Sequence, residues 1–300
     1  FGIDCSFLAT GFRSATYVER QTELCAIAAH NFPALDLNHI SVRNDDGVAY
    51  LEAMSPVDCI FLDPARRNEH GGKTVAISDC EPNVAKLEGL LLSKANRIMI
   101  KLSPMLDLSQ ALKELPHTQE VHIISVNNEC KELLLLLGQT APEEIPVHCV
   151  NLSTKGEQEK QLFVFTREQE QHSECSYTDT LGNYLYEPNA SLLKAGAFRS
   201  IAAAYSVKKL HPNSHLYTSE TQIEGFPGRT FRIINRCSLN KKEIKENLSD
   251  LKKANITVRN FPATVAELRK RIKLAEGGDT YLFASTLNDG QKILIRCGKV

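Results

Sequence analysis

Long apolar runs are missing from this 300-residue sequence. Even the five leucines of Leu133 to Leu137 fall far short of the roughly 20 apolar residues that a membrane-spanning helix needs. No signal peptide is recognisable at the amino end. A hydrophobic fraction of 42% and a charged fraction of 24% are ordinary for a globular protein. The sequence therefore predicts a cytoplasmic protein with no membrane partner.

Paired cysteines are missing as well. The nine cysteines are scattered singly, and no two have the Cys-x-x-Cys spacing of zinc sites and redox motifs. His172 and Cys175 are three positions apart, but nothing nearby completes a set of ligands. The sequence therefore predicts no metal site, and reduced core thiols in a reducing compartment.

Charge is balanced over the whole chain but not along it. From Lys194 onward, 20 Lys and Arg accompany 9 Asp and Glu, a net charge of +11, which leaves −12 for residues 1–193. A basic module joined to an acidic one suits a polyanionic partner, because Lys and Arg displace counterions from phosphates. Electrostatic attraction between two domains of the same chain is the alternative explanation.

The first 170 residues alternate between strand and helix patterns. The expected strands are Ala15–Val18, Ile40–Val42, Val57–Leu62, Arg97–Ile100, Glu120–Ser125, Val147–Leu152 and Gln161–Phe165. The expected helices are Gln21–Ala29, Gly47–Met54, Val84–Ala95 and Leu108–Leu115. This alternation predicts an α/β fold with a Rossmann-like, doubly wound sheet. The last two strands follow each other without a helix, so we expect an antiparallel hairpin at one sheet edge.

The remainder of the chain has a different pattern. Residues 168–183 are polar and predict a linker, and Ala190–Tyr205 predicts an amphipathic helix. The last seventy residues predict strand, helix, strand, helix and hairpin, a small α+β domain with its helices on one sheet face. The expected elements are Thr230–Ile234, Lys241–Ala254, Ile256–Arg259, Val265–Leu274, and a hairpin of Thr280–Ser285 with Lys292–Cys297.

Four local features occur in the order that a nucleotide-type cofactor site requires. Gly2 precedes the expected helix Cys5–Thr10, where a glycine lets the backbone approach a ligand. Glu19 ends a strand and can accept hydrogen bonds from both ribose hydroxyls. Asn44-Asp45-Asp46 follows the next strand and can reach an adenine edge. The fourth feature, Asp63-Pro64-Ala65-Arg66-Arg67, follows the apolar strand Val57–Leu62.

Each feature also has a plainer explanation. An acid after a strand is commonly a helix cap, and Asp45 or Asp46 could simply cap the helix that starts at Gly47. The run after Leu62 could be an ordinary strand-ending turn. It is more specific than the others, because Pro64 stops the strand and places Asp63 at the carboxyl edge, where open α/β sheets bind ligands.

Several of these strings resemble the class I S-adenosylmethionine-dependent methyltransferases, in particular the bacterial branch with a C-terminal THUMP-like domain. The first domain shows this in Phe1-Gly-Ile-Asp-Cys-Ser-Phe-Leu-Ala9, Tyr17-Val-Glu-Arg20, Ala29-His-Asn31 and Phe61-Leu-Asp-Pro-Ala-Arg-Arg67. The tail shows it in Val258-Arg-Asn-Phe-Pro262, Leu268-Arg-Lys-Arg-Ile272 and Gly277-Gly-Asp-Thr-Tyr-Leu-Phe283. The resemblance implies a methyltransferase domain over 1–170, a connecting subdomain over 184–229 and a THUMP-like domain over 230–300.

The resemblance also implies roles for single residues. Gly2 and Asp4 would line the methionine end of S-adenosylmethionine, and Glu19 would hold its ribose. Asp45 would lie near the adenine, and Asp63 with Pro64 would form the motif at the methyl-transfer site. One departure is that Phe1 falls inside the glycine loop, so we expect a strand and further glycines upstream of it.

The target of the methyl group is narrowed by residue types. A carboxylate in the Asp63 turn can accept a hydrogen bond from an amino group or ring NH and so orient a nucleophilic nitrogen. Ala65 departs from the related motifs of enzymes that act on exocyclic amines, which leaves the atom open. The segment Lys101–Asp107 lacks the cysteine that methylation of pyrimidine carbon uses, which favours nitrogen.

The THUMP likeness favours RNA, either tRNA or rRNA, as the substrate. Lys101, Arg66 and Arg67 could hold phosphate, although Lys101 could equally be a solvated charge at a strand end. In the tail, Arg269-Lys270-Arg271 with Lys273 could contact RNA, or could be a solvated helix face. A methyltransferase acting on a protein or small molecule, and an inactive RNA-binding module, are the alternative functions.

Overall fold

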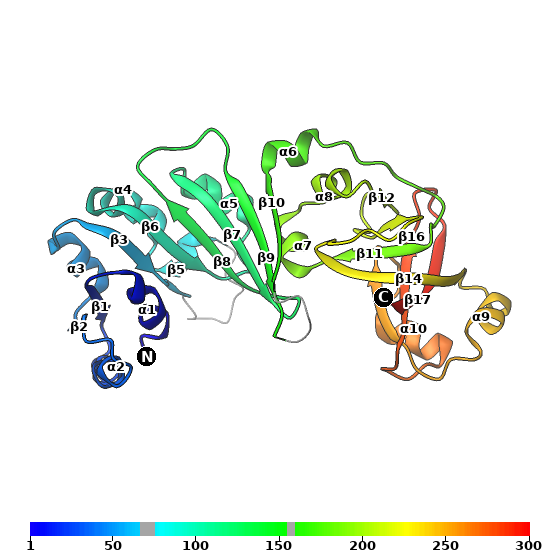
Figure 1. Ribbon diagram of the computed structural model, residues 1–300, viewed down its shortest axis with the longest axis horizontal. Helices are drawn as coiled ribbons and strands as arrows, with labels where there is room; N and C mark the ends of the chain where they lie inside the picture. The colour runs from blue at the N-terminus through cyan, green and yellow to red at the C-terminus, as the bar shows by residue number, and fades with distance from the viewer. Residues whose placement is uncertain (67–75, 155–159) are drawn as a thin grey trace. The chain divides into compact units, whose positions relative to one another are not determined.

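A computed structural model describes residues 1–66, 76–154 and 160–300 of the chain (Figure 1). The described residues fall into two compact units. The first unit contains residues 1–100, 105–117 and 136–140, and the second contains residues 101–104, 118–135 and 141–300. In the described part of the chain, no helix is both long enough and apolar enough to cross a membrane.

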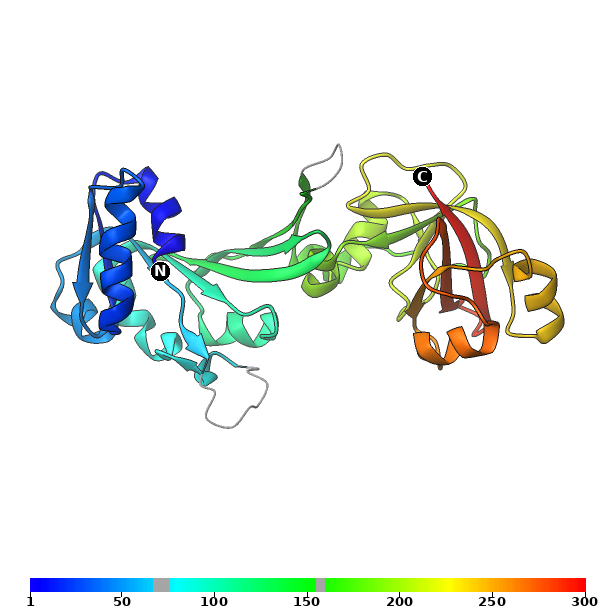
Figure 2. The same ribbon diagram turned by 90° about the horizontal axis from the view of Figure 1, so that it is seen from below.

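The first unit begins with two helical turns and a strand–helix–strand segment. α1 (Ile3–Leu8) and a 3-10 turn (Ala9–Gly11) precede β1 (Ala15–Glu19), α2 (Thr22–Ala34) and β2 (Ile40–Asn44). The two strands are parallel, with Ala15 opposite Ile40 and Glu19 opposite Asn44. α2 lies along both strands (Figure 2) and buries Phe32, whose ring meets Tyr17 edge-on at 5.7 Å between centroids. This packing fixes the ends of β1 and β2 side by side.

The next strands of the first unit are also parallel. β3 (Val57–Leu62) follows α3 (Gly47–Ala53), and β6 (Ala95–Leu102) follows α4 (Val84–Lys94); α5 (Leu108–Glu114) comes after β6. The register places Leu62 opposite Ile100. β3 is only half-buried and its Val57 is exposed, although the apolar sequence predicted cover on both faces. The reason is that β3 is the last strand of its sheet within the described residues.

A six-stranded sheet has the strand order β10-β9-β7-β8-β6-β3. Its remaining members are β7 (Thr118–Val126), β8 (Glu129–Leu137), β9 (Pro146–Leu152) and β10 (Lys160–Thr166). β9 and β10 form the predicted antiparallel hairpin at the sheet edge. β8 was not predicted. It contains the leucine run, in which Leu133, Leu135 and Leu137 are buried.

The second unit also contains a seven-stranded sheet of order β12-β13-β11-β14-β17-β16-β15. The strands are β11 (Tyr184–Pro188), β12 (Lys208–Lys209), β13 (Tyr217–Ser219), β14 (Gly228–Cys237), β15 (Asn255–Arg259), β16 (Thr280–Thr286) and β17 (Lys292–Lys299). Each face of this sheet has its own core. Leu282 and Ala284 pack with Leu248 of α9 (Lys241–Leu248) and Leu268 of α10 (Val265–Ile272), so both helices lie on one face as predicted.

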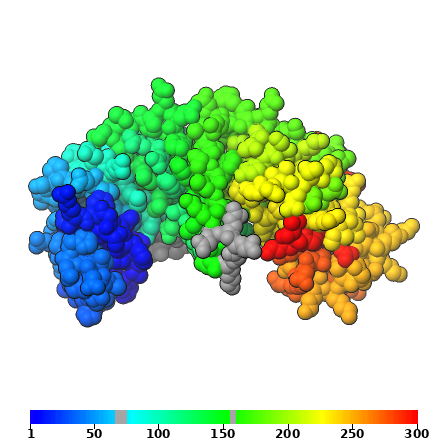
Figure 3. Space-filling model, viewed as in Figure 1, coloured from blue at the N-terminus to red at the C-terminus, as the bar shows by residue number. Residues whose placement is uncertain are grey.

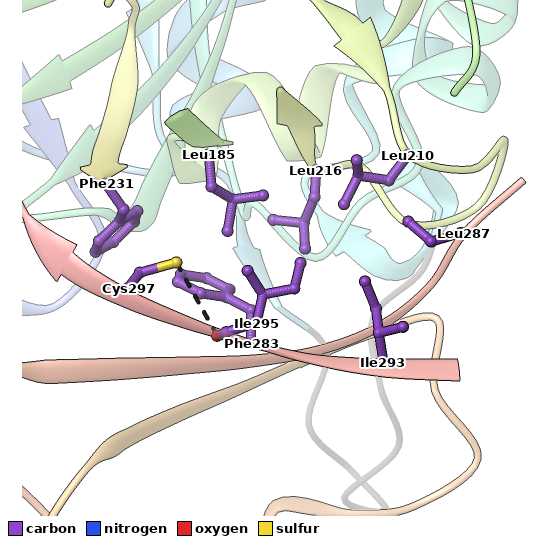
Figure 4. Packing of buried hydrophobic residues seen from close by; sticks show 9 residues of the cluster. All are labelled: Leu185, Leu210, Leu216, Phe231, Phe283, Leu287, Ile293, Ile295 and Cys297. Carbon is purple, nitrogen blue, oxygen red and sulfur yellow. Dashed lines mark hydrogen bonds between the residues drawn. The ribbon is translucent and has the colours of Figure 1, made fainter. Parts of the chain in front are cut away.

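The other face of the seven-stranded sheet packs against the segment before it. Phe283 alternates with Leu282 along β16 and therefore points to the opposite side. It joins a cluster with Leu185, Leu210 and Leu216 (Figure 4). The strands between residues 184 and 219 thus continue the sheet and also supply part of its core.

The connecting helices differ from the expected pattern. The stretch Ala190–Tyr205 is not one helix but two, α7 (Ala190–Ala195) and α8 (Arg199–Ala204), because Gly196 ends α7 in the left-handed region at φ 78°. The polar segment expected to be a linker contains α6 (Arg167–His172). Within it, the Glu170 carboxylate accepts hydrogen bonds from the backbone NH groups of Phe198, Arg199 and Ser200. Glu170 therefore caps the start of α8 and ties this segment to the fold.

Candidate functional site

The carboxyl ends of β1 and β2 are joined by one asparagine side chain. The Asn44 Nδ2 donates to the backbone oxygens of Glu19 and Arg20, each at 3.0 Å, and its Oδ1 accepts from the Thr22 hydroxyl at 2.9 Å. The Glu19 carboxylate accepts from the backbone NH of Gln21 at 2.8 Å. These bonds hold the turn after β1 in one conformation, so the half-buried Glu19 side chain is fixed at the strand end.

Gly2 occupies a position that only glycine fits without strain. Its φ is 70°, in the left-handed region, and a Cβ added there would lie 2.5 Å from the Phe32 ring. Gly2 is the residue that caps α1, and Asp4 lies half-buried in the first turn of that helix. The glycine is therefore required by its positive φ and by the Phe32 ring that packs against it.

The two acids after β2 have different surroundings. Asp46 is the N-cap of α3, and its Oδ1 accepts from Val48 at 2.9 Å and from Ala49 at 3.0 Å. The capping explanation therefore holds for Asp46. Asp45 is exposed, and its Oδ1 accepts from the backbone NH of Asp46 at 2.8 Å. Both acids are exposed, but only Asp46 caps α3, so Asp45 is the one whose side chain the cap does not explain.

Asp63 and Pro64 lie directly beyond β3, and Asp63 is exposed. The chain then forms a short strand, β4 (Ala65–Arg66), that pairs antiparallel with β5 (Cys80–Glu81), with Ala65 opposite Glu81. Arg20 donates to the Glu81 carboxylate at 3.2 Å. The turn that follows Glu19 and the strand that follows Asp63 are therefore linked through a single ion pair.

The other predicted phosphate-binding residues are only partly described. Lys101 is half-buried and lies within β6, directly after Ile100, the register partner of Leu62. The backbone of Arg66 belongs to β4. Arg67 lies outside the described residues.

Burial raises the pKa of Cys5, which is next to Asp4, and also that of Cys59, which lies on β3. Both thiols therefore stay protonated near neutral pH, which makes them poor nucleophiles.

The basic cluster on α10 is not uniform. Arg269 is 21% exposed, donates to the Ala254 carbonyl at 3.3 Å and lies 3.9 Å from Glu276. Arg271 donates to the Leu239 carbonyl at 2.8 Å, and Lys270 is exposed. The two arginines thus stabilise the fold around α10, whereas Lys270 and the exposed Lys273 that ends the helix are open to a partner.

Sequence reasoning missed the residues that hold the site together. Asn44 was noted only as part of a polar string, and the Arg20–Glu81 pair was not anticipated. Nothing local marks Glu81, because its partner is far away in the sequence.

The α1 side chains exposed near Gly2 include Ile3 and Phe7, and α1 lies at the surface of the first unit (Figure 3).

Comparison with known proteins identifies the family. Residues 184–227 match a family described as a ferredoxin-like domain, and residues 228–299 match one described as THUMP domain-like. A crystal structure of a candidate methyltransferase from Porphyromonas gingivalis W83 is 38% identical, with a TM-score of 0.89. The match covers 100% of this chain and 75% of that chain. No functionally curated protein matches the sequence. The chain belongs to the family of methyltransferases that carry a C-terminal THUMP-like domain.

Proposed function

We propose that this protein transfers a methyl group from S-adenosylmethionine to a base nitrogen in RNA, either tRNA or rRNA. The observation that carries the proposal is the pair of matches, a candidate methyltransferase 38% identical over the whole chain and a THUMP domain-like family over residues 228–299. The placement of Glu19 and Asp63 at the carboxyl ends of two strands agrees with it.

The residues fit this cofactor. A carboxylate fixed at the end of β1 suits a vicinal diol. When bound, S-adenosylmethionine supplies the methyl group as a reactive sulfonium. We assign Gly2 and Asp4 to its methionine end, Glu19 to its ribose and Asp45 to its adenine.

The chain's own residues orient the acceptor. Asp63 accepts a hydrogen bond from the amino group or ring NH of the base and points the nitrogen lone pair along the line of displacement. Pro64 fixes the turn that presents this carboxylate. Phosphates next to the target nucleotide are held by the cations Lys101, Arg66 and Arg67. We propose that the methyltransferase domain extends over residues 1–170 and is followed by a connecting subdomain at 184–229 and the THUMP-like domain at 230–300.

Glu19→Ala is expected to weaken S-adenosylmethionine binding by about 10- to 100-fold, because each charge-assisted hydrogen bond contributes about 1.5–3 kcal/mol. Isothermal calorimetry on the full chain measures the change. The matched control is Glu23→Ala, which removes an exposed acid from the first turn of α2. Equal affinity in wild type and Glu19→Ala would rule out the ribose role.

Lys270→Ala combined with Lys273→Asn is expected to weaken binding to total tRNA and to lower the slope of log K against log salt by about 1–2. Asparagine is chosen because Lys273 has a φ of 57°, which asparagine tolerates. The control replaces two exposed lysines of the first unit, Lys86 and Lys113, with alanine. A salt slope that is the same in all three proteins would show that α10 does not contact RNA.

A further inference from the structure

Three side chains of types that can ligate a metal ion lie together on one face of the six-stranded sheet. β7 and β9 run parallel, and the register places His122 directly opposite His148. Glu120 precedes His122 by two positions on β7 and therefore shares its face. The neighbouring Val121, Ile123 and Cys149 point the other way and are fully buried. The three polar side chains thus extend from strands whose opposite face is packed in the core.

The donor atoms of the three side chains converge. The Glu120 Oε2 lies 3.1 Å from the His122 Nε2 and 3.8 Å from the His148 Nε2. The donor atoms of all three residues lie within 4.8 Å of one another. Donors around a tetrahedral zinc ion are ~3.3 Å apart, given bonds of about 2.0–2.1 Å. The His148 nitrogen is therefore about half an ångström too far from the Glu120 oxygen, and the stacked imidazole rings must turn for a nitrogen of each to face one ion.

The cluster is accessible as well as ordered. The side chains of Glu120, His122 and His148 are 45%, 27% and 25% exposed. The two imidazole rings stack at 4.4 Å between centroids with their planes 8° apart, which orders both of them.

We propose that Glu120, His122 and His148 bind a divalent transition-metal ion of the zinc class. Two imidazole nitrogens and one carboxylate oxygen are the donors that such ions prefer. Three protein ligands leave a fourth position for water or for a ligand atom, so the site is an open one. It is separate from the proposed methyl-transfer site in residues and in chemistry, and its test does not depend on that function.

The sequence alone could not predict this metal site. Zinc motifs are recognised by close spacing, whereas His148 belongs to a different strand from Glu120 and His122. Only the parallel pairing of β7 with β9 brings the three residues together. The prediction of no metal site rested on cysteine spacing, which has no bearing on this cluster.

Zinc titration of the full chain, reduced and freed of metal, tests the proposal. We expect one equivalent to bind, and we expect His122→Gln and His148→Gln each to weaken binding by more than about 100-fold, because a lost ligand costs more than a lost supporting bond. His30→Gln, on the exposed side of α2, is the matched control and should bind like wild type.

Two further readouts distinguish this site from surface or thiol binding. Cobalt in place of zinc should give visible ligand-field bands without a thiolate charge-transfer band, because no cysteine is a proposed ligand. Zinc should raise the melting temperature of wild type but not of Glu120→Gln, which keeps the size of the side chain. Absence of stoichiometric binding, a thiolate band, or undiminished affinity in both histidine variants would overturn the proposal.

Discussion

Replacing Asp63 with alanine is expected to slow methyl transfer by about 10²- to 10⁴-fold, the range typical of a positioned group at the reacting centre. Binding of S-adenosylmethionine should stay within about twofold of wild type, because the proposed cofactor contacts come from other residues. The physical reason is that Asp63 is proposed to orient the acceptor nitrogen, and a misdirected lone pair cannot meet the methyl group in line.

Single-turnover rates and equilibrium cofactor binding, measured on the same preparations, separate the two effects. The matched control is Asp58→Ala, because Asp58 is an exposed acid near the opposite end of the same strand, β3. Asp63→Asn keeps one hydrogen-bond acceptor and should retain more activity than the alanine variant. If Asp63→Ala transferred methyl groups as fast as Asp58→Ala does, the assignment of Asp63 to the acceptor would be wrong.

Glu187→Ala is expected to destabilise the seven-stranded sheet by about 1.5–3 kcal/mol, the usual contribution of hydrogen bonds to charged groups, because the two arginines it pairs with are 41% and 36% exposed. Glu187 on β11 is 1% exposed and accepts from two arginines. Arg229 of β14 donates through its Nε at 2.9 Å and through its NH2, and Arg259 of β15 donates at 2.8 Å. Loss of the carboxylate would leave two guanidinium groups side by side with no counter-charge between them.

Hydrogen exchange of the β11 and β14 amides reports the opening free energy of this sheet directly. Glu246→Ala, which removes an exposed acid of α9, is the control and should change it by less than about 0.5 kcal/mol. Triple replacement of Glu187, Arg229 and Arg259 by methionine should recover part of the loss, because no charge then remains unpaired. Equal protection in Glu187→Ala and Glu246→Ala would contradict the stabilising role of Glu187.

The Glu187 cluster also bears on how the second unit folds. Glu187 belongs to the segment that matches the ferredoxin-like family, whereas Arg229 and Arg259 belong to the THUMP-like segment. Gly228 opens β14 opposite Pro188, and a Cβ there would overlap the Glu187 carbonyl. The two segments therefore share one sheet and one ion-pair network. We infer that they fold together, so neither is a suitable fragment for binding experiments.

Much of the fold was predictable where a local pattern decided it. Val57–Leu62 is apolar except for Asp58 and is stopped by Pro64, and β3 has these same bounds. β8 was missed because the run Leu133–Leu137 has no alternation of apolar and polar residues, so periodicity could not separate strand from helix. The conformation of this run is determined by its pairing with neighbouring strands in the sheet, which depends on the tertiary structure and not on the local sequence.

The candidate site divides in the same way. Glu19 and Asp63 were placed at strand ends by sequence, and the structure has them there. Two ion pairs could not be predicted, Arg20–Glu81 and Glu187–Arg229, since each joins residues that are distant in the chain. An acid such as Glu187, between Tyr186 and Pro188, carries no sequence signal that it is buried. The roles of the site residues remain predictions.

Transfer of labelled methyl groups from S-adenosylmethionine to RNA tests the central claim most directly. The substrate is total RNA from cells that lack this protein, and the enzyme is the full-length protein, with Asp63→Ala in parallel. We expect the wild-type protein to label tRNA or rRNA, and we expect the variant to transfer at least about 100-fold less label. Cofactor binding without label in any RNA would contradict it and would direct attention to protein or small-molecule acceptors.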